Sequence, residues 1–440
     1  MKHLLLLFTF LSIVNDAYSQ KKKSIDDVPK YRRNSLATIL LSDGNYENKD
    51  KVLNAYADYK FPEQYDDHRI DVKSADLTSL ILTEEEMESF LSDLGKTKEE
   101  YETSIEVSKA IMGEGFKDER MDIYKIKKFL KDSLVANKLL QKWFDNDSNN
   151  KIDQDLISKR GLYNLSKEEI DVINNSAVTA KNSVIQGASL DLIPQTFVVL
   201  NKMNFISNEL MASLIKAQTD ELAPKEEGML RDMALAASQK VYEKTSIGYS
   251  VWTTSYLFKL KYEKKDQDLM YYDMDQDGFD FTKQVLSYDL ELEHIGTEKA
   301  NSLVTVSLKK EDKNRSEDDI INLATIRNVE KVFSKLTKKY EDFKPKVPLA
   351  DFGKPITAFI GMKEGLEGGE TFEVLNVEFD NKTGREIYRS VGKIKVDKKS
   401  IWDNRQTLDG KPSDPSGPDR TSFKGKAKKA TYGSLLRLIK

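Results

Sequence analysis

The stretch TFVVLNKMNF at residues 196–205 decides the fold, because it is rich in the β-branched and aromatic residues that favour strands. A second run, SLATILLS at residues 35–42, is short and apolar and precedes turn residues, which predicts another buried strand. Between the two runs, Ser166 and Glu169 form a capping box that predicts a helix over residues 166–187. A helix followed by a buried strand is typical of α/β proteins, so we expect a mixed α/β (α+β) fold.

Further helices are predicted between these two strands and after the second one. Two capping boxes, Thr83 with Glu86 and Ser316 with Asp319, mark helix starts. Apolar residues at helical spacing predict a long amphipathic helix over residues 118–144 and a pair of helices over residues 208–244.

Extended segments follow the helix pair. Residues 249–262, 280–293 and 302–309 are predicted to be antiparallel strands, and Asp277-Gly278 is a typical hairpin turn between the first two.

Three prolines mark the main boundary of the chain, at positions 345, 348 and 355. Beyond them the sequence predicts strands at residues 356–362, 371–379 and 390–396, joined by glycine-containing turns. We therefore expect a larger helix-and-sheet part followed by a small all-β C-terminal module. The predicted divisions are a signal peptide (1–19), a mixed α/β region (20–343) with a candidate subdomain break near 208–248, the β module (344–402), and a polar loop with a basic tail (403–440).

Residues 1–19 have the pattern of a secretory signal peptide. Lys2 and His3 form a basic start, residues 4–14 are an almost unbroken apolar run, and Ala17-Tyr18-Ser19 is a small-x-small site. The apolar run is too short to span a bilayer. We therefore expect export with cleavage before Gln20, to the periplasm, the cell surface or the outside of the cell.

The chain has no cysteine, which excludes disulfides, thiolate metal sites and a lipid anchor on cysteine. An exported protein without disulfides favours a bacterial envelope or extracellular setting. No second apolar stretch approaches the roughly 20 residues of a membrane-spanning helix, so we expect no transmembrane anchor. The net charge of −4 argues against a nucleic-acid-binding protein, which would carry a basic excess.

One segment has a recognisable pattern. Residues 354–396 read KPITAFIGMKEGLEGGETFEVLNVEFDNKTGREIYRSVGKIKV. This segment resembles the small C-terminal β-barrel modules of bacterial envelope and flagellar accessory proteins, through Gly365, Leu366, Gly369, Phe372, Val374, Thr383, Gly384, Val391, Gly392, Ile394 and Val396. The whole chain also resembles uncharacterised exported proteins of the Bacteroidetes. Neither resemblance implies a catalytic residue.

Two acidic loops are candidate calcium sites, the one cofactor that the sequence suggests. Calcium loops of this kind place oxygen ligands at alternating positions and a bidentate carboxylate at the twelfth. The first loop offers Asp145, Asp147, Asn149 and Asp153, but position twelve is Leu156. The second loop offers Asp273, Asp275, Asp277 and Gly278, with Gln284 at position twelve.

The C-terminal segment carries the strongest charge asymmetry, a basic surface formed by Lys424, Lys426, Lys428 and Lys429. Such a run can contact lipid phosphates, an anionic glycan or the acidic face of a protein partner. The alternative is a solvated tail whose end, residues 432–439, adds a strand to a nearby sheet.

Motifs of catalysis are missing from the sequence. It contains no phosphate-binding G-x-x-x-x-G-K and no dinucleotide fingerprint, and two histidines outside the signal are too few for a three-histidine zinc site. The leading hypothesis is an exported non-catalytic envelope or extracellular protein that acts through protein or surface contacts. The alternatives are a carboxylate-based hydrolase of glycan or cell wall and a calcium-binding surface protein.

Overall fold

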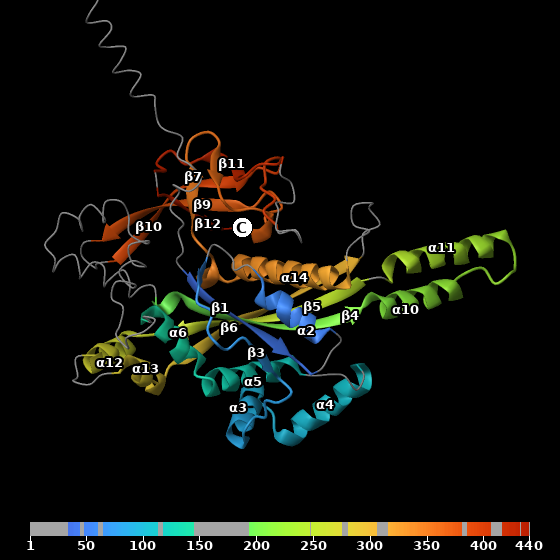
Figure 1. The fold of residues 1–440 in the computed structure, drawn as a ribbon, viewed down its shortest axis with the longest axis horizontal. Coiled ribbons are helices and arrows are strands. Elements are labelled where there is room, and N and C mark those ends of the chain that lie inside the picture. Colours follow the sequence, from blue (N-terminus) through green and yellow to red (C-terminus); the bar gives the residue numbers. More distant parts are fainter. Residues whose placement is uncertain are drawn as a thin grey trace, which may run out of the picture.

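The computed structural model has two β-sheets, one covered by helices on both faces and one closed into a barrel (Figure 1). The predicted mixed α/β fold with an all-β C-terminal part is therefore confirmed. The structure describes residues 34–44, 48–59, 65–112, 118–144, 193–246, 248–274, 280–305, 316–380, 385–405, 416–431 and 433–439. The predicted signal peptide, the helix over 166–187 and the first calcium loop lie outside these ranges.

The first sheet is mixed. Its order is β2-β1-β4-β5-β6, with β3 also paired to β1; β1 runs parallel to β2, β3 and β4, and β4, β5 and β6 are antiparallel. The strands are β1 (Asn34–Ser42), β2 (Tyr65–Asp67), β3 (Ser74–Asp76), β4 (Thr196–Ser207), β5 (Gly248–Lys261) and β6 (Glu291–Thr305). The two runs that predicted buried strands are thus central neighbours, β1 and β4.

Both faces of this sheet are buried because alternate side chains of β1 and β4 point to opposite sides. On one face, Leu36 and Phe197 pack under α2 (Lys49–Ala57) and α14 (Glu317–Lys339), which begins at the predicted Ser316 capping box. On the other face, residues such as Ile39 and Val198 pack against α5 (Glu119–Asp132) and α6 (Val135–Phe144).

The predicted single helix over 118–144 is wrong in one respect, since it is two helices, α5 (Glu119–Asp132) and α6 (Val135–Phe144). The chain breaks at Leu134, whose φ of 52° is left-handed. The break lets each helix bury its own apolar residues against the sheet, Leu130 from α5 and Leu139 from α6. The apolar spacing alone continues across this point, which explains the error.

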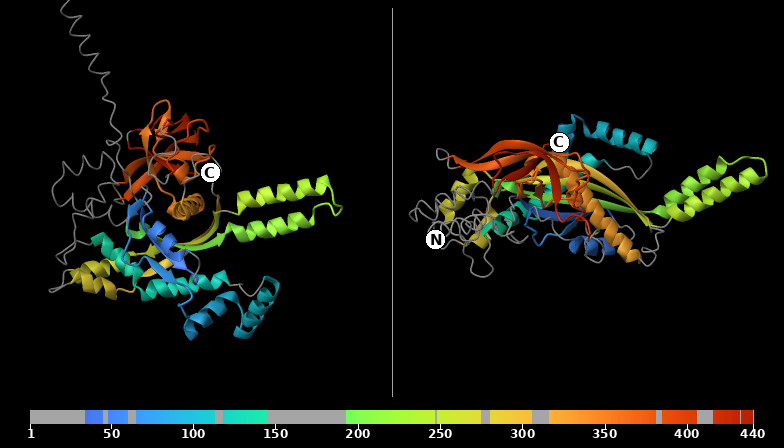
Figure 2. Two further views of the ribbon diagram at one scale, coloured as in Figure 1. Left: turned by 45° about the vertical axis from the view of Figure 1, so that its right-hand side comes forward. Right: turned by 90° about the horizontal axis from the view of Figure 1, so that it is seen from above.

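The predicted helix pair between β4 and β5 is confirmed. It consists of α10 (Asn208–Glu221) and α11 (Met229–Thr245), which form a hairpin that projects from the end of the sheet (Figures 1 and 2). Its tip exposes the apolar side chains of Leu222, Met229 and Leu230. Within the described ranges, no helix has the length and apolar character needed to cross a bilayer.

The predicted strand over residues 280–293 is wrong in its first part, and the predicted turn at Asp277-Gly278 lies outside the described residues. After β5 the chain forms α12 (Lys264–Met274), α13 (Phe281–Gln284) and the short helix η3 (Val285–Ser287), and β6 begins at Glu291. These helices form because Met270 and Val285 bury against Trp143 of α6 in a small separate cluster.

The second sheet is a closed barrel with the strand order β10-β11-β8-β7-β12-β9. Its strands are β7 (Val347–Asp351), β8 (Ile356–Ala358), β9 (Thr371–Asp380), β10 (Arg385–Val396), β11 (Thr421–Lys426) and β12 (Leu435–Leu438). The barrel has an apolar core of its own, including Phe372, Val374, Ile394 and Leu436. The exact domain boundary at 343/344 stays a prediction.

Strands β11 and β12 are part of the β module, contrary to the predicted division, which placed them in a separate loop and tail over 403–440. β11 pairs with β10 and β8, and β12 pairs with β7 and β9, so both strands complete the barrel. Phe423 and Leu436 bury their side chains inside it, and a barrel lacking these strands would expose unpaired edges. The alternative that the chain end adds a strand is confirmed for Leu435–Leu438.

Candidate functional site

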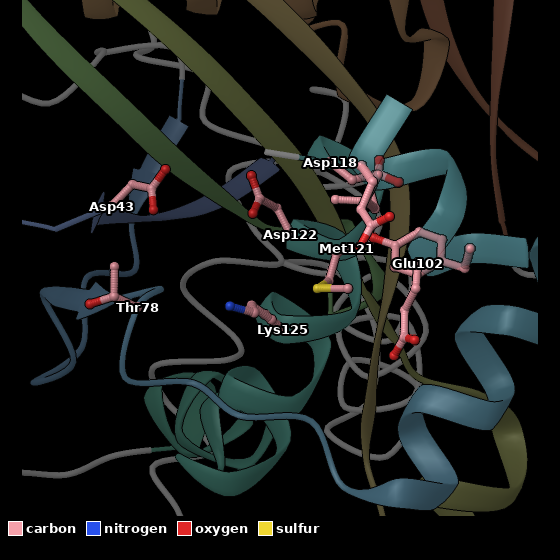
Figure 3. Close-up of a pocket in the computed structure, with 10 residues that line it drawn as sticks. Asp43, Thr78, Glu102, Asp118, Met121, Asp122 and Lys125 are labelled. Atoms are coloured by element: carbon pink, nitrogen blue, oxygen red, sulfur yellow. The ribbon is translucent and has the colours of Figure 1, made fainter. Parts of the chain in front are cut away.

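A pocket of about 550 Å³ lies at the carboxyl end of β1, on the sheet face covered by α5 (Figure 3). Asp43 directly follows β1, Thr78 follows β3, and the other wall is formed by α4 (Lys98–Met112) and the start of α5. Ligands of α/β proteins commonly bind beyond the carboxyl ends of parallel strands. The pocket is lined by the carboxylates of Asp43, Glu102, Glu106, Asp118 and Asp122.

An aromatic cluster holds the outer wall in place. The ring of Phe90, in α3 (Glu84–Leu94), packs edge-on against Tyr101 of α4 and Tyr124 of α5, with centroid distances of 5.2 and 5.1 Å. Such edge-to-face contacts favour a defined helix geometry. They place Tyr101 in the pocket lining.

The innermost carboxylate of the pocket belongs to Asp122, which is buried. It forms a salt bridge with Lys202 of β4 and accepts a hydrogen bond of 3.0 Å from the hydroxyl of Tyr256 of β5. Burial, and then the charge of Asp122, raise the pKa of Tyr256 far above its usual range, so this phenol remains a donor. Lys202 and Tyr256 therefore hold this carboxylate through the same oxygen, Oδ2.

Asp118 is the second carboxylate of the pocket that is held in place, at the start of α5. Its carboxylate caps the helix by accepting from the backbone N–H of Arg120 at 3.0 Å, and it pairs with the Arg120 guanidinium at 2.7 Å. Burial opposes ionisation of Asp118, but the hydrogen bonds from Arg120 outweigh it and lower its pKa. Burial and the charge of Asp118 raise the pKa of Tyr101 to about 12.

The lining of the pocket therefore carries more acidic than basic side chains. Lys125 is the one basic side chain in its described lining, and its ammonium donates to the carbonyl of Leu77 at 3.1 Å. Asp118 suits a cationic group better than proton transfer, because its pKa is lowered and a general acid must hold its proton near neutral pH. The carboxylate of Asp122 is already paired with Lys202. Among the residues that the structure describes, no group of three or more His, Asp or Glu side chains is placed to hold a metal ion.

A second charged surface lies on the barrel, where β10 and β11 pair. Lys393 stands directly opposite Lys426, and Lys395 stands opposite Lys424. All four side chains are exposed, whereas the intervening Ile394 is buried. We call these four lysines the lysine quartet.

The sequence predicted half of the quartet. Lys424 and Lys426 were expected in a basic surface, and Lys428 and Lys429 of the same prediction are exposed just after β11. Lys393 and Lys395 were missed, although lysine alternating with apolar residues in KIKV indicates a strand with a basic outer face.

Few carboxylates balance this surface. Lys424 pairs with Asp397 at 2.8 Å, and Glu373, which stands opposite Lys393 on β9, is engaged by Arg437. For the other three lysines of the quartet, the described part of the chain provides no ion pair.

Of the candidate calcium ligands, the described ranges contain Asp273 alone. Asp145, Asp147, Asn149 and Asp153 lie outside the described ranges, as do Asp275, Asp277 and Gly278 of the second loop. Asp273 lies in the last turn of α12, and its carboxylate accepts a hydrogen bond of 3.0 Å from Tyr288.

Compared with models of known protein families, the chain matches none, and a comparison with curated proteins also finds no match. Function is therefore inferred from the charges and contacts of the chain itself.

Proposed function

We propose that this chain is an exported, non-catalytic envelope or extracellular protein that acts by contact with an extended anionic surface, through the lysine quartet of its barrel. The observation that carries the proposal is the direct opposition of Lys393 to Lys426 and of Lys395 to Lys424. The signal-peptide pattern and the resemblance of residues 354–396 to barrel modules of envelope proteins support it.

Like charges directly opposite each other on neighbouring strands are destabilising. Phosphate or carboxylate groups of a partner would relieve this repulsion, so the quartet gains more from an anion than four scattered lysines would. Lysine also acts as a compact point charge, which suits a diffuse anionic surface, whereas arginine suits bidentate recognition of one phosphate.

The expected contact is weak for a single molecule. A lysine near an anionic membrane surface contributes about 1 kcal/mol, so the quartet gives about 4 kcal/mol, near a millimolar dissociation constant. Firm attachment then requires several copies or additional contacts on the same surface.

Co-sedimentation of the full chain with vesicles tests the proposal. We expect binding to vesicles of anionic phospholipid at low salt, loss of binding at high salt, and no binding to zwitterionic vesicles. A variant with the quartet changed to glutamine should not bind. A matched control changes the exposed lysines Lys98, Lys131, Lys225 and Lys240 to glutamine, which removes the same charge elsewhere and should leave binding intact.

An acidic polysaccharide, presented as beads, is the second arm of this experiment. Binding there that depends on the quartet identifies the anionic surface as glycan. Failure to bind both surfaces, or equal loss in the control variant, would overturn the proposal. Amino-terminal sequencing tests export separately: we expect Gln20 at the mature terminus, and a cytosolic product that keeps Met1 contradicts export.

A glycan hydrolase is the second candidate, favoured by the pocket in which carboxylates and Tyr101 come together. Its general acid would come from Glu102 or Glu106, since the pKa of Asp118 is lowered and Asp122 is paired with Lys202. Release of new reducing ends from cell-wall or dietary glycan by the wild type, and its loss in Glu102→Gln or Glu106→Gln, would replace the non-catalytic proposal.

A further inference from the structure

A small cavity of about 50 Å³ lies where the barrel meets the helix α14. Its lining comes from both parts of the chain: Glu330 and Ser334 of α14, Tyr59 and Tyr65 near the first sheet, and the short helix η6 (Met362–Glu364) of the barrel. Glu330 exposes only 6% of its surface, and its Oε1 atom has no hydrogen-bond partner. A buried carboxylate without a partner is costly when it is charged.

The neighbouring side chains do not neutralise Glu330 by direct contact. Lys363 of η6 places its ammonium 5.9 Å from the centroid of the Tyr59 ring. Glu364 accepts hydrogen bonds from the backbone of Gly361 at 2.6 Å and from Asn404 at 2.8 Å. In the described part of the chain, no basic group lies within ion-pair distance of Glu330.

The junction around this cavity is closely packed. Gly365, which follows η6, has a φ of 79°, and a Cβ atom there would lie 1.7 Å from the Ser334 hydroxyl oxygen. Lys338, one helical turn beyond Ser334, donates to the carbonyl of Gly365 at 2.7 Å. Glu330, Ser334 and Lys338 are spaced by four residues, so one face of α14 carries the whole contact.

We propose that docking of the barrel on α14 is proton-linked, with protonated Glu330 favouring the closed junction and its ionised form loosening it. Closing the junction removes Glu330 from water, and opening it restores hydration of the carboxylate. The junction is thus a pH-sensitive hinge between the α/β part and the barrel. This inference is independent of the lysine quartet, which lies elsewhere on the barrel.

The electrostatic surroundings support this assignment. Burial raises the pKa of Glu330 to about 7; Lys363 lowers it, Glu364 raises it, and Arg405 and Arg327 lower it. Burial also raises the pKa of Tyr59 and Tyr65 well above their usual value, so these phenols stay neutral in the same range.

The sign of the effect follows from the raised pKa. Stabilisation of the closed junction is fully present below the ordinary pKa of a glutamate, 4.5, and is lost as pH rises through about 7. Each unit of pKa difference corresponds to a tenfold change in the equilibrium. Between pH 5 and pH 8 the ratio of open to closed molecules should therefore rise by up to roughly a hundredfold.

Fluorescence energy transfer in the full chain tests this. The chain contains no cysteine, so dyes can be attached at Lys131→Cys in α5 and Lys399→Cys in the barrel, both exposed. We expect the closed fraction to fall from pH 5 to pH 8. In Glu330→Gln, which mimics the protonated acid, the closed fraction should stay high at all pH values.

A matched control is Glu84→Gln, an exposed acid at the start of α3, which should keep the wild-type pH profile. A flat profile in the wild type overturns the proposal without any variant. Identical pH profiles of the wild type and Glu330→Gln would also overturn it, because another group would then be titrating.

Discussion

The first sheet buries a lysine in an ion pair, whereas the barrel exposes lysines opposite one another. Lys202 in β4 is 6% exposed and is joined to Asp122, with Tyr256 completing the hydrogen bonds of that carboxylate. Lys393 and Lys426 in the barrel are exposed and face each other. A buried charge must be paired to be tolerated, whereas the repulsion between exposed like charges is weakened by solvent screening. The first arrangement serves the fold, and the second leaves charge available to a partner.

The largest effect is expected where the charge is buried. Asp122→Ala removes the partner of Lys202 and leaves a buried ammonium unpaired, so the free energy of unfolding should fall by about 3–5 kcal/mol. Denaturant unfolding measures this change. Adding Lys202→Met should recover most of the loss, because an apolar replacement of both partners removes the desolvation cost.

Lys128→Ala is the control for this comparison, since Lys128 is half-buried on α5 and pairs with the exposed Asp132 at 3.1 Å and with Glu86 at 3.5 Å. Its effect should be much smaller. Equal effects of Asp122→Ala and Lys128→Ala would show that the buried pair does not support the fold.

A second large effect is expected in the barrel core. Leu436→Ala in β12 removes a fully buried side chain, and we expect a loss of about 2–5 kcal/mol in barrel stability. Limited proteolysis should then cut the barrel while the α/β part persists, because the two have separate cores. Arg437→Ala, at the neighbouring outward position, is the control. Simultaneous loss of both parts would show that they unfold as one unit.

These two regions also show what the sequence could predict. The strand over 196–205 and the helix starts at Thr83 and Ser316 depend on local patterns, and the structure confirms them. The break at Leu134 has no glycine or proline to mark it, and it follows from packing on both sides. Local sequence patterns thus determine where helices and strands form, and tertiary packing determines where they end.

The candidate sites depend on pairing across the chain. Asp122 and Lys202 are 80 residues apart, and only the sheet brings them together. The opposition of Lys393 to Lys426 depends on the register of β10 and β11, and a shift of one residue would turn either lysine inward. Composition could indicate a basic surface at the chain end, but the four lysines of the quartet could be grouped only from the strand pairing in the barrel.

A third group of charges extends the comparison, the acidic loop of Asp145, Asp147 and Asp153 predicted from the sequence. If these carboxylates bind calcium with a dissociation constant of about 10⁻⁴ M, 1 mM calcium should stabilise the protein by about 1.4 kcal/mol. Thermal unfolding with and without calcium measures this, and Asp147→Ala should abolish the shift. Asp132→Ala is the control that should keep it. The absence of any shift at millimolar calcium would leave the loop as a simple turn.

The smallest effect is expected for the exposed lysines of the barrel, and it distinguishes them most directly from the buried pair of Lys202 and Asp122. Lys393→Gln removes one charge from a directly opposed pair of lysines. Because Glu373, opposite Lys393 on β9, is already engaged by Arg437, the barrel should become more stable by about 0.2–1 kcal/mol at low salt. The gain should shrink as salt is added, because solvent ions already screen exposed charges. Lys424→Gln is the matched control: it relieves the repulsion with Lys395 but also loses the ion pair with Asp397, so its net gain should be smaller. Chemical unfolding of the three proteins at low and high salt distinguishes them. A loss of stability in Lys393→Gln would mean that its ammonium supports the barrel, and the quartet would then be structural, like the pair of Lys202 and Asp122.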